Sequence, residues 1–140
     1  MNAPTSAEHE QYNAPRQEAG PRLAPDVHRT AHVARICDGF RGQQTLVLDL
    51  TKITSLFDYF IITTATNRRQ MNAIADEVNK AMKSSGSPPF GREGADGQSQ
   101  WVVADYGDVV LHVFTPDARE LYDLENLWAD APQVDWQSIT

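Results

Sequence analysis

Three features are scarce in this chain of 140 residues: cysteine, long apolar runs and cysteine–histidine clusters. The only cysteine, Cys37, cannot form a disulfide within the chain, and its apolar neighbours Val33 and Ile36 predict a small core residue. No run approaches the roughly 20 apolar residues of a membrane-spanning helix, and no cysteine–histidine spacing indicates a zinc site. These absences favour a globular protein in a reducing, cytoplasmic setting.

Positive charge is almost missing from the last third of the chain. Residues 95–140 contain Arg119 alone against 9 Asp and Glu residues, whereas residues 1–94 contain 11 Lys and Arg against 10 acids. The formal net charge of −7 therefore comes from the last third. Nucleic-acid binding needs the opposite sign, because its affinity comes largely from neutralised phosphates. Two interpretations stay open: the acidic part meets a basic protein surface, or the charge only keeps the protein soluble.

Glycine-rich phosphate loops and nucleophile elbows are missing as well. Ser55 and Ser99 lie in no elbow motif, so the sequence predicts no catalytic residue and no cofactor. The turn at 63–67, followed by Arg68 and Arg69, combines hydroxyls, helix N-terminal amides and two guanidiniums that could hold a phosphate. The simpler alternative is a capped helix with two solvated arginines.

The chain is predicted to form one folded domain between two tails. Residues 1–24 contain prolines and alanines among polar residues, which predicts a disordered N-terminal tail. This tail has no apolar segment typical of a secretory signal, and its glutamates are atypical of an organellar transit peptide. Residues 25–132 are predicted to fold and bury a core, and residues 133–140 form a short C-terminal tail.

The patterns inside the domain predict helices and strands in the order α-β-β-α-β-β-β-α. Helical spacing of apolar residues predicts one helix from Pro25 to Gly39 or Gly42, with either glycine as a left-handed cap, and a second helix capped by Asn67. Two buried strands are predicted at 44–50 and 58–64, and a short edge strand with a glycine-rich loop at 93–97 is predicted within 90–100. A hairpin follows at 101–114, then a short helix at 116–122 and a further helical turn at 124–128. The fold class is therefore α/β, a single-domain sandwich with a small mixed β-sheet flanked by helices.

The predicted hairpin at 101–114 is the organising element. If Tyr106 and Gly107 are the two turn residues, Asp105 pairs with Asp108. A turn displaced by one residue is the alternative, because Tyr106 takes positive φ only under strain. Side chains alternate between the two faces of a strand, so one face is wholly apolar and belongs in a core. That face carries Val102, Ala104, Val109, Leu111 and Val113.

The other face of the hairpin combines an apolar strip with aromatic and acidic ends, and we expect it to be exposed and to bind a partner. It carries Trp101, Val103, Asp105, Asp108, Val110 and His112. Trp101 is the expected anchor and the two carboxylates would pair with Lys or Arg. Two alternatives are a divalent cation between the carboxylates and His112 as a general base.

Three further residues complete the predicted contact set. Tyr106, at the turn, either contacts the partner or folds back onto the core. Tyr122 and Asp123, after the hairpin, are additional candidates.

Five stretches resemble the ribosomal silencing factor family (RsfS, or Iojap-like). They are DYFII at 58–62, TATNR at 64–68, GREG at 91–94, WVVADYGDVVLHVF at 101–114 and RELYDLENLW at 119–128. The resemblance runs in order from about residue 26 to 132, and its hairpin and final motif are specific. It implies a fold similar to nucleotidyltransferases, but the Gly-Ser motif and the Asp-x-Asp/Glu pair of those enzymes are missing, which implies a protein without catalysis.

The resemblance also implies a function. Members bind the large ribosomal subunit at its protein fourteen, a small basic protein on the intersubunit face, and so block joining of the small subunit and repress translation under nutrient limitation. Homodimers in the free state are a family feature, and contact with ribosomal RNA is expected to be minor or absent. Two competing hypotheses are a nucleotide- or metal-binding enzyme that uses Asp105, Asp108 and Arg68, and a plain dimerisation module.

Overall fold

The computed structural model describes residues 25–94 and 99–139. The tail predicted over 1–24 and part of the glycine-rich loop, 95–98, lie outside the described residues. The elements are, in order, α2 (Val27–Gly39), β1 (Gln43–Asp49), β2 (Tyr59–Thr64), α3 (Arg68–Ser84), β3 (Gly91–Glu93), β4 (Trp101–Asp105), β5 (Val109–Phe114), α4 (Pro116–Tyr122), α5 (Leu124–Leu127) and the 3-10 turn η1 (Trp136–Ser138).

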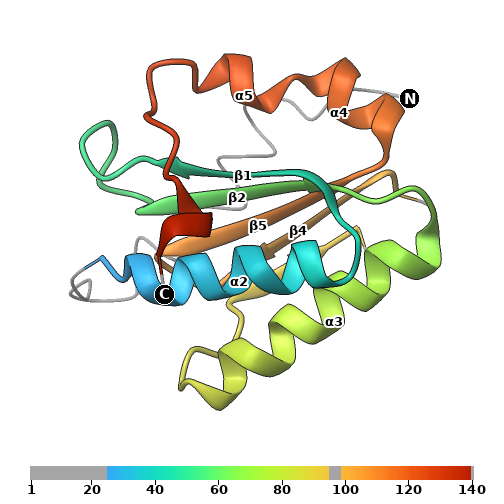
Figure 1. Cartoon of the computed structure of the whole chain (residues 1–140), viewed down its shortest axis with the longest axis horizontal. Helices are drawn as coiled ribbons and strands as arrows, with labels where there is room; N and C mark the ends of the chain where they lie inside the picture. Colours follow the sequence, from blue (N-terminus) through green and yellow to red (C-terminus); the bar gives the residue numbers. More distant parts are fainter. Residues whose placement is uncertain (1–24, 95–98, 140) are drawn as a thin grey trace.

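One five-stranded mixed sheet forms the middle layer of the molecule, in the order β1-β2-β5-β4-β3. The pair β2–β5 is parallel, and the other three pairs are antiparallel. Figure 1 shows α2 and α3 on one face of the sheet and α4 with α5 on the other. The predicted α/β class with a mixed sheet between helices is confirmed; α5 is the further helical turn predicted at 124–128, and η1 is an additional short element.

Side-chain caps define where the long helices begin. Asp26 accepts a hydrogen bond from the backbone N–H of Arg29 at the start of α2, and Asn67 accepts one from Gln70 at the start of α3, as its sequence position predicted. Thr115 accepts from the N–H of Ala118 at the start of α4. None of the helices in the described part of the chain is long and apolar enough to cross a membrane.

The end of α2 differs from the prediction. Neither Gly39 nor Gly42 has a positive φ; Arg41 takes the left-handed conformation instead, with φ 65°. Gly42 is required for a different reason, because a methyl group there would lie 2.8 Å from the carbonyl oxygen of Cys37 and would collide with Oγ1 of Thr63. The glycine therefore permits close approach between the end of α2 and the sheet.

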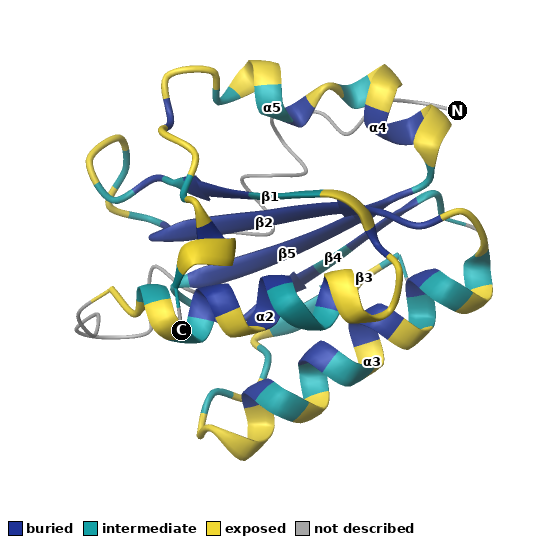
Figure 2. Ribbon diagram, viewed as in Figure 1, coloured by how far each residue is buried: buried dark blue, intermediate teal, exposed yellow. Residues whose placement is uncertain are grey.

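Both faces of the sheet are buried, and each has its own core. Figure 2 shows the strands as the most continuously buried part of the molecule. The α2–α3 core contains Cys37, Val102, Ala104, Leu111 and Val113, the apolar hairpin face predicted from the sequence, together with the inner side chains of both helices. The α4–α5 core lies on the opposite face and contains Phe60, Trp101, Val110 and Phe114.

The hairpin turn lies one residue beyond the first of its two predicted positions, so each residue of β4 pairs with a residue two positions further along β5. Trp101 pairs with Phe114 and Asp105 with Val110, so Gly107 and Asp108 form the turn. Gly107 has φ 96°, so the positive φ that the turn requires falls on a glycine and Tyr106 does not adopt it. Moving the turn by one residue changes the partners but not which face each side chain occupies, so the predicted division into two faces is retained.

The segment predicted to be a C-terminal tail, 133–140, is packed as far as Ile139. The backbone N–H of Val134 donates to the carbonyl oxygen of Val47 at 2.8 Å, and Gln133 forms an isolated bridge with Leu48. The indole Nε1 of Trp136 donates to the carbonyl oxygen of Thr45 at 3.1 Å. These bonds cover the outer edge of β1, which would otherwise be open to pairing with another chain.

Candidate partner-binding surface

Trp101 and His112, the expected centre of the contact strip, are buried between the sheet and the α4–α5 layer. Their exposed fractions are 8% and 2%. The indole Nε1 of Trp101 donates to Nδ1 of His112 at 3.1 Å. An accepting Nδ1 carries no proton, so the imidazole in this arrangement is neutral with its proton on Nε2.

Aromatic side chains that follow the hairpin in sequence cover this pair. The ring of Tyr122 lies 5.1 Å from that of Trp101, and the ring of Trp128 lies 5.6 Å from that of Phe60, which itself lies 4.5 Å from His112. Val110 is buried and Val103 is partly buried at the same place. The expectation that this strip is exposed was therefore wrong, because the final helical segment supplies the cover that an apolar sheet face needs.

The two carboxylates of the strip make structural contacts instead of lying side by side. Asp105 is 2% exposed, and its Oδ1 accepts a hydrogen bond from the backbone N–H of Gly107 at 2.8 Å. Asp108 forms an ion pair with Arg29 of α2, whose guanidinium also donates to Ser87. The shifted register separates the carboxylates, since Asp105 lies opposite Val110. Among the described residues, no group of three or more metal-ligating side chains is placed to hold a metal ion.

Tyr106 takes the second of its two predicted positions and folds onto the α2–α3 core. It is buried, and its hydroxyl donates to Oδ1 of Asn79 at 3.3 Å. Burial raises the pKa of Tyr106 to about 12. The side chain therefore contributes to packing against α3 and offers no surface to a partner.

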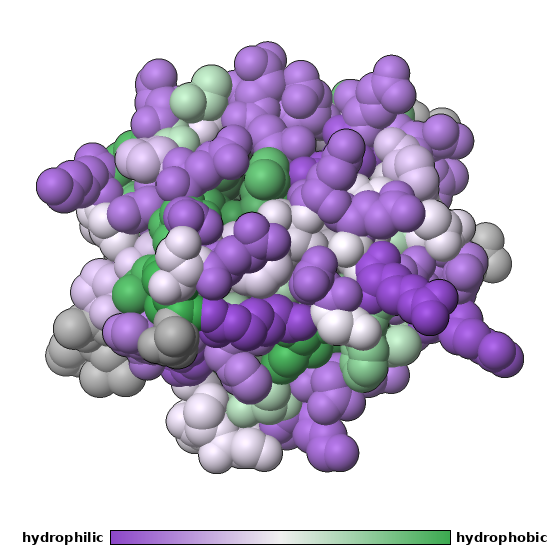
Figure 3. Space-filling model, in the orientation of Figure 1, coloured by the Kyte–Doolittle hydropathy of each residue, from purple (hydrophilic) through white to green (hydrophobic). Residues whose placement is uncertain are grey.

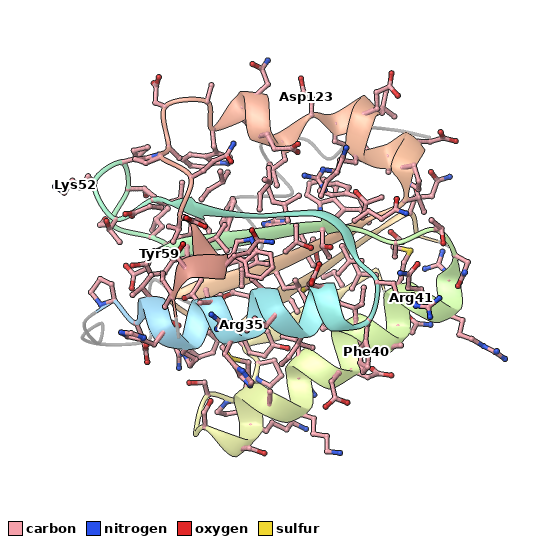
Figure 4. The ribbon with its side chains drawn as sticks, viewed as in Figure 1. Arg35, Phe40, Arg41, Lys52, Tyr59 and Asp123 are labelled. Atoms are coloured by element: carbon pink, nitrogen blue, oxygen red, sulfur yellow. The ribbon has the colours of Figure 1, made fainter. Side chains whose placement is uncertain are left out.

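Asp123 is the one exposed member of the nine predicted contact residues. It joins α4 to α5 in the left-handed conformation, with φ 47°. Tyr122 next to it is partly buried, because its ring points inward to Trp101. Figure 4 shows Asp123 on the outer layer of the molecule, away from the sheet.

The sequence analysis missed the outer side of the segment that contains Asp123, which we call the α4–α5 surface. Its exposed members are Asp117, Glu120, Leu121, Asp123, Asn126 and Leu127. Leu121 and Leu127 are 59% and 68% exposed, which are the highest fractions among the large apolar residues in the described part of the chain. The available signal was their spacing, since Leu121 falls between the inward-facing positions 118 and 122, and Leu127 between the inward-facing positions 124 and 128. Exposed apolar side chains with a polar rim can mark a protein contact, and these residues are the candidate for one here.

A cavity of about 670 Å3 lies beside this surface, between α4 and the start of β1. Arg119 forms its inner wall and is 7% exposed; its guanidinium donates to Thr64 Oγ1 at 2.9 Å and to Glu125 Oε2 at 3.3 Å. Glu120, Asp123 and Glu125 also line the cavity, so three carboxylates oppose one guanidinium. The excess negative charge suits a cationic side chain.

Only part of the phosphate-binding site predicted around the start of α3 is available to a ligand. The guanidinium of Arg68 donates to the carbonyl oxygens of Gly94 and Ser99, and so holds the connection between β3 and β4. Arg69 is exposed. Arg68 is therefore a structural residue, and only its neighbour can meet an anion.

Comparison of the sequence with known proteins gives a family for this chain. Residues 24–140 match the sequence model of the family described as "Ribosomal silencing factor during starvation" (RsfS). The chain is 41% identical to Ribosomal silencing factor RsfS of Bacillus subtilis over 102 residues, which cover 73% of this chain and 86% of that protein. It is 29% identical over 105 residues to the chloroplastic protein Iojap of Arabidopsis thaliana, covering 74% of this chain and 42% of that protein.

A solved structure agrees with the fold. The crystal structure of a protein from Chromobacterium violaceum superposes with a TM-score of 0.69 at 35% identity, covering 75% of this chain and 88% of that one. The resemblance inferred from the sequence motifs is therefore confirmed.

Proposed function

The chain belongs to the ribosomal silencing factor family, and we propose that it binds the large ribosomal subunit and sterically blocks its joining to the small subunit. The observation that supports a docking function most directly is the α4–α5 surface, where two exposed leucines lie among carboxylates. Apolar side chains supply affinity when they are desolvated, and the surrounding charges select the partner.

The proposed partner on the subunit is its protein fourteen, the basic protein that the family resemblance implies. The segment from Pro116 to Leu127 carries four carboxylates and the single cation Arg119, whose guanidinium is turned inward. A surface of this sign attracts a basic protein and repels the bare phosphates of ribosomal RNA. The charge imbalance noted in the sequence is thus concentrated on the side that we propose to dock.

The acidic cavity beside Arg119 offers a binding site for one cationic side chain of the partner. We propose that a Lys or Arg side chain of the partner enters it and pairs with Glu120, Asp123 and Glu125. Asp123, the exposed residue of the predicted contact set, would then touch the partner directly. The buried pair Trp101 and His112 acts indirectly, because it supports the helical segment that carries the surface.

Co-sedimentation with purified large subunits tests the proposal. Leu127→Ala is expected to weaken binding about fivefold or more, since an exposed leucine at the centre of a docked surface is desolvated there. Asp123→Lys is expected to weaken it further, because it places a cation at the mouth of the acidic cavity. Matched controls are Ile53→Ala, an aliphatic residue 42% exposed on the β1–β2 loop, and Asp38→Lys, an exposed acid on α2.

The two sets of variants separate the possible outcomes. Both controls should sediment with the subunit like the unchanged protein, and circular dichroism should show that all four variants are folded. Unchanged binding of both Leu127→Ala and Asp123→Lys would show that another surface docks. A subunit-joining assay with added small subunits then tests occlusion, and the unchanged protein should reduce the yield of joined ribosomes.

The competing enzyme hypothesis receives no support from the placement of its residues. Asp105 and Asp108 are separated by the shifted register, and Arg68 holds the β3–β4 connection. The homodimer remains a proposal, and mass measured against protein concentration tests it. If the dimer uses the α4–α5 surface, Leu127→Ala will weaken both self-association and subunit binding.

A further inference from the structure

The sheet separates two helical layers of opposite charge, and the layer opposite the α4–α5 surface is basic. Helices α2 and α3 with the loop after α2 carry seven cationic residues against three acids, Asp38, Asp76 and Glu77. The cations are Arg29, Arg35, Arg41, Arg68, Arg69, Lys80 and Lys83. Strongly hydrophilic side chains extend over this side of the molecule in Figure 3. The net charge of the chain hides this division, because it sums both layers.

A cavity of about 560 Å3 lies within the basic layer, where the loop after α2 meets the first turns of α3. Phe40, Arg41 and Arg69 contribute to its lining, and none of the described residues that line it is a carboxylate. The Phe40 side chain is 39% exposed. Neither guanidinium has a hydrogen bond or ion pair with another residue in the described part of the chain. The cavity therefore presents two available cations beside an accessible aromatic ring.

The geometry of this cavity is fixed by Gln70. Its Nε2 donates to the carbonyl oxygens of Phe40 and Arg41, at 3.0 and 2.9 Å, and its Oε1 accepts from the backbone N–H of Thr66 at 2.8 Å. These bonds tie the loop after α2 to the first turn of α3. The ring and the two guanidiniums are thus carried by a braced backbone, which lowers the entropy cost of ordering them around a ligand.

We propose that this cavity binds single-stranded RNA, with a base stacked on Phe40 and the flanking phosphates paired with Arg41 and Arg69. Basic side chains beside an exposed aromatic are the combination that binds single strands, because every base has a face that can stack. A duplex does not suit the site, since its bases are already stacked and only its phosphates are accessible. Lys80 and Lys83, further along α3, extend the positive layer beyond the cavity.

The proposed RNA site is independent of the α4–α5 surface. Figure 4 shows Phe40 and Arg41 on the side of the sheet opposite Asp123. A molecule docked by its acidic surface therefore leaves the basic layer open to RNA. The proposal does not require the docking function, and a test on the isolated protein separates the two.

Fluorescence anisotropy with a labelled oligouridine strand, titrated with the full chain at several KCl concentrations, tests the proposal. Phe40→Ala is expected to weaken binding about fivefold or more and to leave the salt dependence unchanged, because it removes stacking and no charge. Arg41→Gln with Arg69→Gln is expected to make the slope of log K against log salt shallower by about 1.4, which corresponds to two phosphate contacts. Lys52→Gln, a cation on the distant β1–β2 loop, is the matched control and should change neither quantity.

Three results would overturn the proposal. The first is equal affinity for Phe40→Ala and the unchanged protein, which would show a charged surface without a base site. The second is displacement of the strand by uridine monophosphate at the same nucleotide concentration, which would show a site for a free nucleotide. The third is salt-sensitive self-association that is lost in the double arginine variant, which would show that the acidic surface of a second copy covers the cavity. Melting temperatures that match the unchanged protein confirm that each variant is folded.

Discussion

At the residue scale, the aromatic cluster over β4 and β5 determines the position of α4 and α5 on the sheet. Trp101 contacts the rings of Phe114 and Tyr122 at 4.8 and 5.1 Å, and it also donates its N–H to His112. An indole with both ring contacts and a hydrogen-bond partner is fixed in one orientation. The α4–α5 surface therefore depends on a side chain that is itself buried.

Trp101→Ala is expected to destabilise the fold by about 3–5 kcal/mol, because it leaves a cavity under α4 and removes the hydrogen bond to His112. Trp101→Phe keeps a ring but loses the donor, and should cost about 1–3 kcal/mol. Urea unfolding followed by far-UV circular dichroism measures both values. A loss below about 1 kcal/mol for Trp101→Ala would contradict the buried position.

Two buried acids of high pKa predict how stability depends on pH. Burial raises the pKa of the Cys37 thiol from 9.0 to about 12, and that of the Tyr106 hydroxyl from 10.0 to about 12. Both groups stay protonated in the folded protein while the unfolded chain releases its protons, so the free energy of unfolding falls as pH rises from about 9 towards 12. The slope from one such group is about 1.4 kcal/mol per pH unit.

Urea midpoints measured at pH 8, 9, 10 and 11 should therefore decrease in the alkaline range. Cys37→Ala should flatten the curve between pH 9 and 10 and reduce its slope above pH 10, whereas Tyr106→Phe should reduce the slope only above pH 10. A thiol reagent at pH 8 should react with Cys37 only at the rate of local unfolding. Immediate reaction of the folded protein would contradict the burial of the thiol.

At the element scale, the edges and ends of the strands are secured by segments distant in sequence. The C-terminal segment hydrogen-bonds to the edge of β1 through Val134 and Trp136, and Arg35 of α2 donates to the carbonyl oxygen of Trp136 at 3.3 Å. Arg119 of α4 reaches Thr64 at the end of β2. These contacts join α2 to β1 through the C-terminal segment, and α4 to β2.

Gly42→Ala tests the close approach between α2 and β2. The added methyl group would collide with Thr63 and with the carbonyl oxygen of Cys37, which should cost about 1–3 kcal/mol. Gly39→Ala is the matched control, because its methyl group would meet no atom within 4 Å and its φ is not positive. That substitution should be neutral or stabilise α2 by up to about 1 kcal/mol. Equal effects of the two substitutions in thermal unfolding would contradict the packing.

At the scale of the whole molecule, charge is divided by the sheet. The layer of α4 and α5 is acidic, and the layer of α2 and α3 on the opposite face of the sheet is basic. A molecule with such a charge distribution is oriented by the field of a partner before contact, which raises the association rate. The same field weakens as salt shortens the screening length.

Asp117→Lys combined with Glu120→Lys is expected to slow association with the large subunit and to reduce the salt dependence of the association rate. The dissociation rate should also rise, because Glu120 lines the cavity that we propose receives the partner's cation, whereas Asp117 lies at the exposed rim and contributes to steering. Biolayer interferometry on immobilised subunits at 50 to 300 mM KCl measures both rates. Asp38→Lys on the basic layer should not slow association. An unchanged association rate for the double variant would rule out steering by this surface.

Local patterns in the sequence determined most of the elements and their faces. The helix that Asn67 caps, the buried strands and the apolar face of the hairpin all follow from side-chain spacing and capping chemistry, which act over a few residues. The family motifs were local in the same way. The division of charge between the first 94 residues and the remainder was also visible in the sequence, although its spatial meaning was not.

Only the tertiary structure decided which apolar face stays exposed. The sequence pattern predicted that Trp101 and His112 belong to an exposed contact strip, but both are buried. Alternation along a strand shows which face is apolar, and it does not show which other segment covers that face. The cover comes from Tyr122 and Trp128, and their packing transfers the candidate contact to the outer side of α4 and α5. Likewise, the cavity that joins Phe40 to Arg69 forms between residues far apart in sequence, so no local pattern could reveal it.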